Sequence, residues 1–112
     1  MTNDLTWREF ERVELRVGTV RTAAPNLHAR KPAYVLTIDF GAERGILKSS
    51  AQITDHYAAE TLVGTQVVAV VNFPPKQIAK TISECLVVGA LDSGGVVLLR
   101  PDQSVPDGTR IA

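Results

Sequence analysis

The chain has 112 residues, one cysteine and no formal net charge, and 45% of its residues are hydrophobic. This length predicts a single domain over residues 1–112, and one cysteine excludes an intrachain disulfide. No apolar run is long enough to cross a bilayer, and the N-terminus lacks the basic and apolar blocks of a secretory signal, so we expect a cytoplasmic protein that does not insert into membranes.

A short helix is predicted at the N-terminus. Thr6 and Glu9 have the spacing of a capping box, and Trp7, Phe10 and Val13 recur near one helical face. A solvent-exposed Trp-Phe face is unfavourable in a small protein, since burying one large aromatic side chain contributes about 1.5–3 kcal/mol of stabilising free energy. These side chains therefore either cover one end of their own domain or contact a partner subunit.

Three short strands are predicted next, over residues 15–21, 33–40 and 46–50. The first two have side chains that alternate between two faces, which is the period of a strand. Gly18 is expected to mark a bulge or bend in the first strand. Residues 25–32 form a polar loop between the first two strands, and residues 41–45 form a turn.

The second half begins with a segment of helical composition, residues 51–64, with Gly64 as a plausible stop. Ser50 is either the helix cap or a ligand contact. Residues 65–73 are a β-branched strand that ends at Pro74 and Pro75, because proline cannot donate to a strand ladder. A loop is expected from there through Ser83.

Residues 84–91 and 96–100 flank an Asp-Ser-Gly-Gly turn and predict a hairpin, and a last short strand is expected over residues 109–112. Three strands, a helix and then two or three strands is the order of an all-β OB-fold. We therefore expect a five-stranded Greek-key barrel with an N-terminal helix and a C-terminal strand extension. A generic small β-barrel is the alternative.

The neutral total charge conceals an uneven distribution. Residues 16–80 carry eight cations and four anions, whereas residues 1–15 and 81–112 each carry two cations and four anions. This pattern fits either a basic central surface between acidic ends or scattered solvated charge.

Six segments in order resemble the tRNA-binding-domain family, and within it an export-related chaperone branch, over about residues 7–112. They are ELRVGTV, KPAYVLTIDFG, SSAQIT, VVAVVNFPPKQIA, SECLVVGA and PDQSVPDGTRIA. The resemblance implies an OB-fold homodimer that binds tRNA or other structured RNA by shape. In the chaperone branch it also implies binding of unfolded or exported polypeptides, with the secretion machinery as a partner. A stand-alone tRNA-binding or tRNA-delivery module without chaperone activity is the alternative.

The candidate RNA-binding residues centre on the segment after the double proline. A rigid corner would hold Lys76 and Lys80 ready for phosphate, although both lysines could equally serve only to keep a loop soluble. The resemblance adds Asn72 and Ser83, whose residue types match the family, although Asn72 could also satisfy backbone groups at a strand end. The family commonly places basic residues at the positions of Gln77, Ala79 and Ile82 and glycine at that of Lys80, which implies weaker RNA binding here.

Other cations could extend this surface. Arg30 and Lys31 lie in the loop between the first two strands, which OB-folds use for ligands, and Lys48 lies on the third strand. Arg16 is either directed into a groove or paired with a carboxylate such as Asp39.

Polypeptide binding or dimer formation would use an apolar groove or a cleft between subunits. The candidate residues for this role are Trp7, Phe10, Gln52, Phe73 and Pro75.

No catalytic, metal or cofactor site is expected. His28 and His56 lack partners at metal-ligand spacing, and the apolar neighbours of Cys85 indicate a buried, inert thiol. Because only 5% of residues are aromatic, recognition of RNA shape is favoured over stacking on single strands. The sequence therefore predicts a binding protein and not an enzyme.

Overall fold

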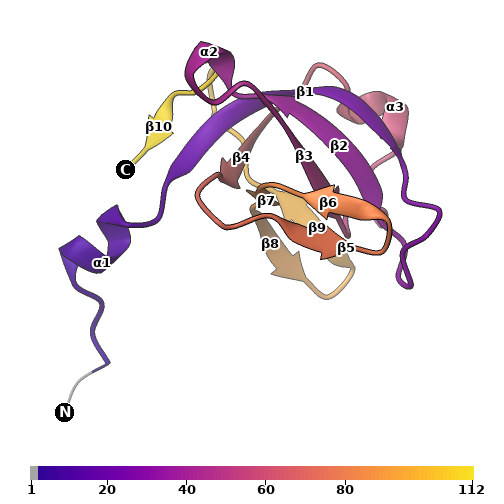
Figure 1. The fold of residues 1–112 in the computed structure, drawn as a ribbon, viewed down its shortest axis with the longest axis horizontal. Coiled ribbons are helices and arrows are strands. Elements are labelled where there is room, and N and C mark those ends of the chain that lie inside the picture. The colour runs from indigo at the N-terminus through magenta and orange to yellow at the C-terminus, as the bar shows by residue number, and fades with distance from the viewer. Residues whose placement is uncertain (1–2) are drawn as a thin grey trace.

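The computed structural model describes residues 3–112 and consists mainly of short strands (Figure 1). The helices are α1 (Trp7–Glu11), α2 (Gly41–Arg44) and α3 (Ala59–Leu62). The strands are β1 (Leu15–Pro25), β2 (Tyr34–Asp39), β3 (Ile46–Ala51), β4 (Gln66–Val70), β5 (Lys76–Ile78), β6 (Thr81–Ser83), β7 (Leu86–Val87), β8 (Gly89–Asp92), β9 (Gly95–Leu98) and β10 (Arg110–Ile111). Within residues 3–112, no helix has the length and hydropathy that a bilayer span requires.

The main sheet has the strand order β3-β2-β1-β4-β7, with β10 also paired to β1, and all of its pairs are antiparallel. The two edges of this sheet approach each other where β3 meets the segment between β6 and β7. There the Glu84 amide donates to the Lys48 carbonyl at 2.7 Å, and the Lys48 amide donates to Glu84 Oε1 at 3.0 Å. The expected all-β OB-fold barrel, with its N-terminal helix and C-terminal strand, is confirmed.

The barrel encloses one apolar core. Leu36, Ile38 and Phe40 are at most 1% exposed, as the alternation along the second predicted strand indicates. Val20 from β1 and Val67 from β4 are fully buried against them. Each central strand therefore contributes alternate side chains to the interior.

Gly18 serves close packing and not a bulge. It pairs regularly with Val67, while the register shift in β1 falls further along, between Val20 and Thr22. A β-carbon at Gly18 would lie 2.7 Å from both Ile38 Cγ2 and Phe40 Cδ1. The bend expected at this glycine therefore occurs at Arg21, and the glycine allows Phe40 to lie against the β1 backbone.

The helix predicted over residues 51–64 is wrong over most of its length. β3 continues to Ala51, and only Ala59–Leu62 is helical. Ala51 and Ile53 are buried while Gln52 between them is exposed, so the strand's period of two continues past the expected boundary. Ser50 is consequently a strand residue paired with Val35 and not a helix cap.

The loop expected over residues 74–83 is also wrong, because it contains the hairpin of β5 and β6. Lys76 pairs with Ser83 and Ile78 with Thr81, and the turn between them places Ala79 at a φ of 54°. β4 ends at Val70, before the end at Phe73 that the prolines predicted, and the two prolines do not prevent strand pairing immediately afterwards.

The remaining turns agree with expectation except at one point. β8 and β9 form the hairpin predicted at Asp92–Gly95, and β10 lies within the predicted last strand. The predicted strand 84–91 is divided into β7 and β8, since the Val88 amide donates to the Val68 carbonyl between two separately paired segments.

Replacing Gly18 with alanine should destabilise the barrel by about 1–3 kcal/mol, because the new methyl group overpacks the core at Phe40. Gly94→Ala is the matched control, since its β-carbon would find its nearest neighbours at 3.7 Å. Urea denaturation measures both free energies of unfolding. Equal stabilities for the two variants would contradict this account of Gly18.

Candidate interface for RNA and polypeptide

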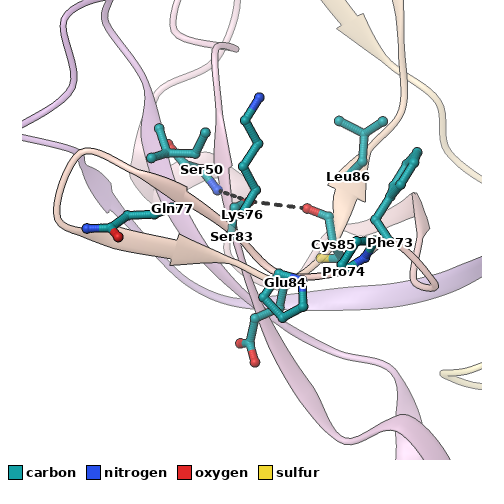
Figure 2. A pocket seen from close by; sticks show the side chains of 11 residues that line it. Ser50, Phe73, Pro74, Lys76, Gln77, Ser83, Glu84, Cys85 and Leu86 are labelled. Atoms are coloured by element: carbon teal, nitrogen blue, oxygen red, sulfur yellow. Dashed lines mark hydrogen bonds between the residues drawn. The ribbon is translucent and has the colours of Figure 1, made fainter.

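A pocket of about 730 Å³ lies between the β5–β6 hairpin and the start of β7 (Figure 2). Its polar lining includes Lys76 and Ser83, and its apolar lining includes Phe73, Pro75 and Leu86. Two residues predicted to bind RNA and two predicted to bind polypeptide therefore meet in one cavity. Its volume is in the range of about 300–1,000 Å³ that is common for ligand sites.

The hairpin and the strand end hold the pocket walls in place. Ser83 Oγ accepts from the Ser50 amide at 3.1 Å and donates to the Cys85 carbonyl at 3.3 Å, so it joins β3, β6 and the segment before β7. In Figure 2 the side chains of Lys76, Phe73 and Leu86 project to the same side of the ribbon. Phe73 is 55% and Leu86 53% exposed, so apolar surface remains open to solvent here.

The one carboxylate in the pocket lining is directed elsewhere. Figure 2 shows Glu84 on the opposite side of the ribbon from Lys76. Its Oε1 atom accepts the Lys48 amide, as described for the barrel closure. The ammonium group of Lys76 therefore has no neutralising carboxylate on its own side of the pocket lining.

The other predicted cations are distributed over three elements. Lys80 lies in the turn of the β5–β6 hairpin, and Lys48 lies on β3 opposite Thr37. Arg30 and Lys31 lie in the loop between β1 and β2, where Lys31 lines a separate pocket of about 320 Å³ together with Gln52. All five cations are exposed, and within residues 3–112 none of them forms an ion pair.

Three arginines, by contrast, are paired with acids. Arg16 Nε lies 3.2 Å from Glu14, whose second partner is Arg44. Desolvation raises the pKa of Glu14, but hydrogen bonds and charge from Arg44 and Arg16 outweigh it, so this pKa is lowered. Asp39 pairs with Arg21 at 2.7 Å, so Arg16 is paired with a different carboxylate from the one suggested by the sequence.

Asn72 holds two backbone groups of the N-terminal segment. Its Nδ2 donates to the Arg12 carbonyl at 2.6 Å, and its Oδ1 accepts from the Glu14 amide at 3.0 Å. Of the two readings left open, the structure therefore shows the one in which Asn72 satisfies backbone at a strand end. This amide fixes the connection between α1 and β1.

Trp7 and Phe10 lie apart from the pocket. The capping box of Thr6 and Glu9 forms as predicted, and α1 stands away from the barrel in Figure 1. Trp7 is 86% exposed, and both aromatic residues line a third pocket of about 560 Å³ with Ile111 of β10. Trp7 therefore does not cover the end of its own barrel.

The cysteine beside the hairpin has little nucleophilic character. Desolvation, and secondly the negative charge of Glu84, raise the pKa of Cys85 to about 12. Such a thiol is protonated at neutral pH. Across residues 3–112, no group of three or more histidine, cysteine or acidic side chains is arranged to hold a metal ion.

Sequence reasoning missed Leu86 and Ile78 as pocket residues. Leu86 belongs to an apolar run that resembles core, but it pairs with Val70 at the sheet edge and its side chain is directed outward. Residues 85–87 are all apolar, so the sequence carries no signal that separates exposed Leu86 from buried Cys85. Ile78 was missed because residues 74–83 were expected to form a loop without strands.

Two solved structures share this fold and nearly half of this sequence. Chaperone CsaA from Bacillus anthracis is 49% identical, with a TM-score of 0.91, over 97% of this chain and 99% of that chain. CsaA chaperone protein from Picrophilus torridus is 46% identical, with a TM-score of 0.92, over 97% of this chain and 100% of that chain. These matches confirm the resemblance to the chaperone branch.

Longer relatives contain a similar region. Methionine–tRNA ligase from Methanothrix thermoacetophila is 37% identical over 103 residues, which is 92% of this chain but 15% of the ligase. The chain thus spans only a small part of such enzymes. Residues 15–110 match the family model described as a putative tRNA binding domain. The chain belongs to this tRNA-binding-domain family.

Proposed function

We propose that the protein is a non-catalytic, cytoplasmic binding module for tRNA or other structured RNA. The observation that supports this most is the set of five exposed cations on the hairpin, β3 and the β1–β2 loop, none of which is paired with an acid within residues 3–112. Lysine and arginine contacts to phosphate supply most sequence-independent affinity for nucleic acid. Family membership supports the same ligand.

Shape is the proposed basis of RNA recognition. Within residues 3–112, Phe73 is the one aromatic side chain in the lining of the large pocket, which is too few for a stacking platform along a single strand. Hydroxyl groups accompany the lysines instead. Lys48 lies opposite Thr37, whose hydroxyl is 2.6 Å from that of Thr22. Phosphates and ribose hydroxyls of folded RNA suit these groups.

Replacing both Lys76 and Lys80 with glutamine should weaken tRNA binding and reduce its dependence on salt. Loss of two phosphate contacts should make the log-log slope of affinity against salt shallower by about 1.4–1.8. Titration of bulk tRNA at several salt concentrations measures this slope. Arg100→Gln removes one exposed cation outside the pocket and should leave the slope nearly unchanged. A slope unaffected by the double substitution would refute the proposal.

We further propose that the protein acts as a chaperone in protein export, binding unfolded or exported polypeptides and delivering them to the secretion machinery. The supporting observation is the open apolar wall formed by Phe73 and Leu86. Exposed apolar surface in a concave site favours apolar side chains of a ligand. The solved relatives named as chaperones support this second role.

Adding the protein to an unfolded, aggregating client should delay the rise in light scattering. Phe73→Ala with Leu86→Ala should remove most of this delay, since both changes remove apolar pocket wall. Val63→Ala is the matched control, because Val63 is 48% exposed and lies outside the lining of the three pockets described. If the unaltered protein gives no delay, a tRNA-binding or tRNA-delivery module without chaperone activity is the better description.

We also propose a homodimer that buries Trp7 and Phe10. A side chain of this size that is 86% exposed leaves a large apolar surface in water, and a symmetric partner would cover two copies of it. The pocket beside α1 includes Ile111, so β10 would lie at the same interface.

Sedimentation velocity should show a dimer, and Trp7→Ala should raise its dissociation constant at least about tenfold, given the 1.5–3 kcal/mol that burial of one large aromatic contributes. Leu27→Ala serves as the control, since Leu27 is equally exposed but lies in the β1–β2 loop. A monomer at micromolar concentration would rule out this assembly.

A further inference from the structure

The 730 Å³ pocket at the β5–β6 hairpin contains side chains suited to two different ligands. Lys76 offers a positive charge to phosphate, and Phe73 and Leu86 offer an apolar wall to a polypeptide side chain. All three project to the same side of the ribbon in Figure 2. An RNA phosphate and a polypeptide side chain would therefore contact the same face of this hairpin.

We infer that this pocket is a shared site, which one protomer gives either to an RNA phosphate group or to an apolar segment of an unfolded polypeptide, but not to both. The inference rests on the proposed function, because it supposes that both ligands bind. It adds a relation between them: RNA displaces the polypeptide, and the polypeptide displaces RNA.

Space is the first reason for exclusion. A charge-assisted hydrogen bond from a lysine ammonium to a phosphate oxygen is about 2.7–2.9 Å long. An RNA backbone at that distance from Lys76 would lie across the opening of the 730 Å³ cavity, where the main chain of a bound polypeptide would also have to lie. Lys76 directly follows Pro75 and is paired with Ser83, so it belongs to the same rigid frame as the rest of the lining.

Solvation is the second reason. A phosphate that contacts Lys76 releases condensed counterions but keeps water on its remaining oxygens, whereas an apolar side chain gains free energy by removing water from Phe73 and Leu86. Placing the two groups side by side would strip water from a charged phosphate without full compensation, which is unfavourable. The only carboxylate of the lining, Glu84, is directed to the opposite side and does not separate the two environments.

Linkage makes the exclusion reciprocal. If bound tRNA weakens polypeptide binding by some factor, bound polypeptide must weaken tRNA binding by the same factor. In a dimer each protomer carries its own pocket, so one subunit could hold RNA while the other holds polypeptide. The exclusion operates within each pocket, and saturating RNA should therefore remove polypeptide from both subunits.

The test uses bulk tRNA and a fluorescently labelled, thiol-blocked unfolded protein of near-zero net charge, so that repulsion between two polyanions is not measured. Fluorescence anisotropy first gives the dissociation constant of each ligand alone. Polypeptide titrations are then repeated at increasing fixed tRNA concentration. With tRNA at ten times its own dissociation constant, the apparent constant for the polypeptide should rise about 11-fold and continue to rise in proportion to added tRNA.

Two variants separate the contributions of the pocket. Lys76→Gln should weaken tRNA binding, and the tRNA concentration needed for half-displacement should rise by the same factor. Phe73→Ala should weaken the polypeptide while leaving the affinity for tRNA nearly unchanged. Val63→Ala, which alters an apolar side chain of similar exposure (48%) outside the three pockets described, should change neither dissociation constant. Circular dichroism checks that all variants are folded.

If the apparent dissociation constant for the polypeptide reaches a plateau at saturating tRNA, a ternary complex forms, and this result would overturn the shared site. Unchanged polypeptide affinity in Phe73→Ala would also overturn it, because the polypeptide would then bind elsewhere. Failure of either ligand to bind alone would overturn the proposed function itself, and this result is visible before any competition is measured.

Discussion

The seam between β3 and residues 83–85 is the contact on which the site depends. An open antiparallel sheet leaves two edges with unpaired backbone groups, and closing the sheet satisfies them. Here the closure uses reciprocal hydrogen bonds between Lys48 and Glu84, together with the Ser83 hydroxyl on the Ser50 amide. Because the same residues lie at the base of the hairpin, barrel closure also fixes the position of the pocket. Residues that close the barrel, Ser83 and Glu84, therefore lie next to Leu86, which forms an exposed wall of the pocket.

Charged side chains in this protein are divided between two tasks. Arg16, Arg21 and Arg44 are engaged with carboxylates and stabilise the barrel near β1. The lysines of the hairpin and β3 remain exposed and unpaired within the described residues. Guanidinium groups suit fixed, planar pairing, whereas ammonium groups on flexible stems suit contact with a variable phosphate backbone. A chain with no net charge can thus present unpaired lysines locally, since within residues 3–112 the ion pairs involve only arginines as cations.

Much of the barrel could be predicted from local patterns. The capping box at Thr6, the alternation that buries Leu36, Ile38 and Phe40, and the Asp92–Gly95 turn each depend on neighbouring residues alone. The predictions that were wrong concern segments whose structure depends on contacts with residues distant in the sequence. Residues 51–58 have helical composition, but Ala51 ends β3 by pairing with Tyr34 on β2, and residues 52–58 are neither helix nor strand.

The site was only partly predictable for the same reason. Phe73, Pro75, Lys76 and Ser83 are close in sequence and meet in one pocket, whereas Lys31 of the β1–β2 loop lines a different pocket. Which apolar residue faces solvent was decided by strand pairing that no single window contains, as Leu86 illustrates through its pairing with Val70. Composition identified the residue types needed for binding, and topology decided which of them are neighbours.

The Asn72 side chain has a mechanical consequence for these separate regions. It directly precedes Phe73 in the chain, yet both of its polar atoms hold the backbone that leads out of α1. Any ligand that displaces the main chain at Phe73 pulls on that carboxamide, and so on the segment carrying the exposed tryptophan. The Asn72 side chain, together with the bond from the Val71 amide to the Glu14 carbonyl, thus joins the wall of the cavity to the segment that leads out of α1.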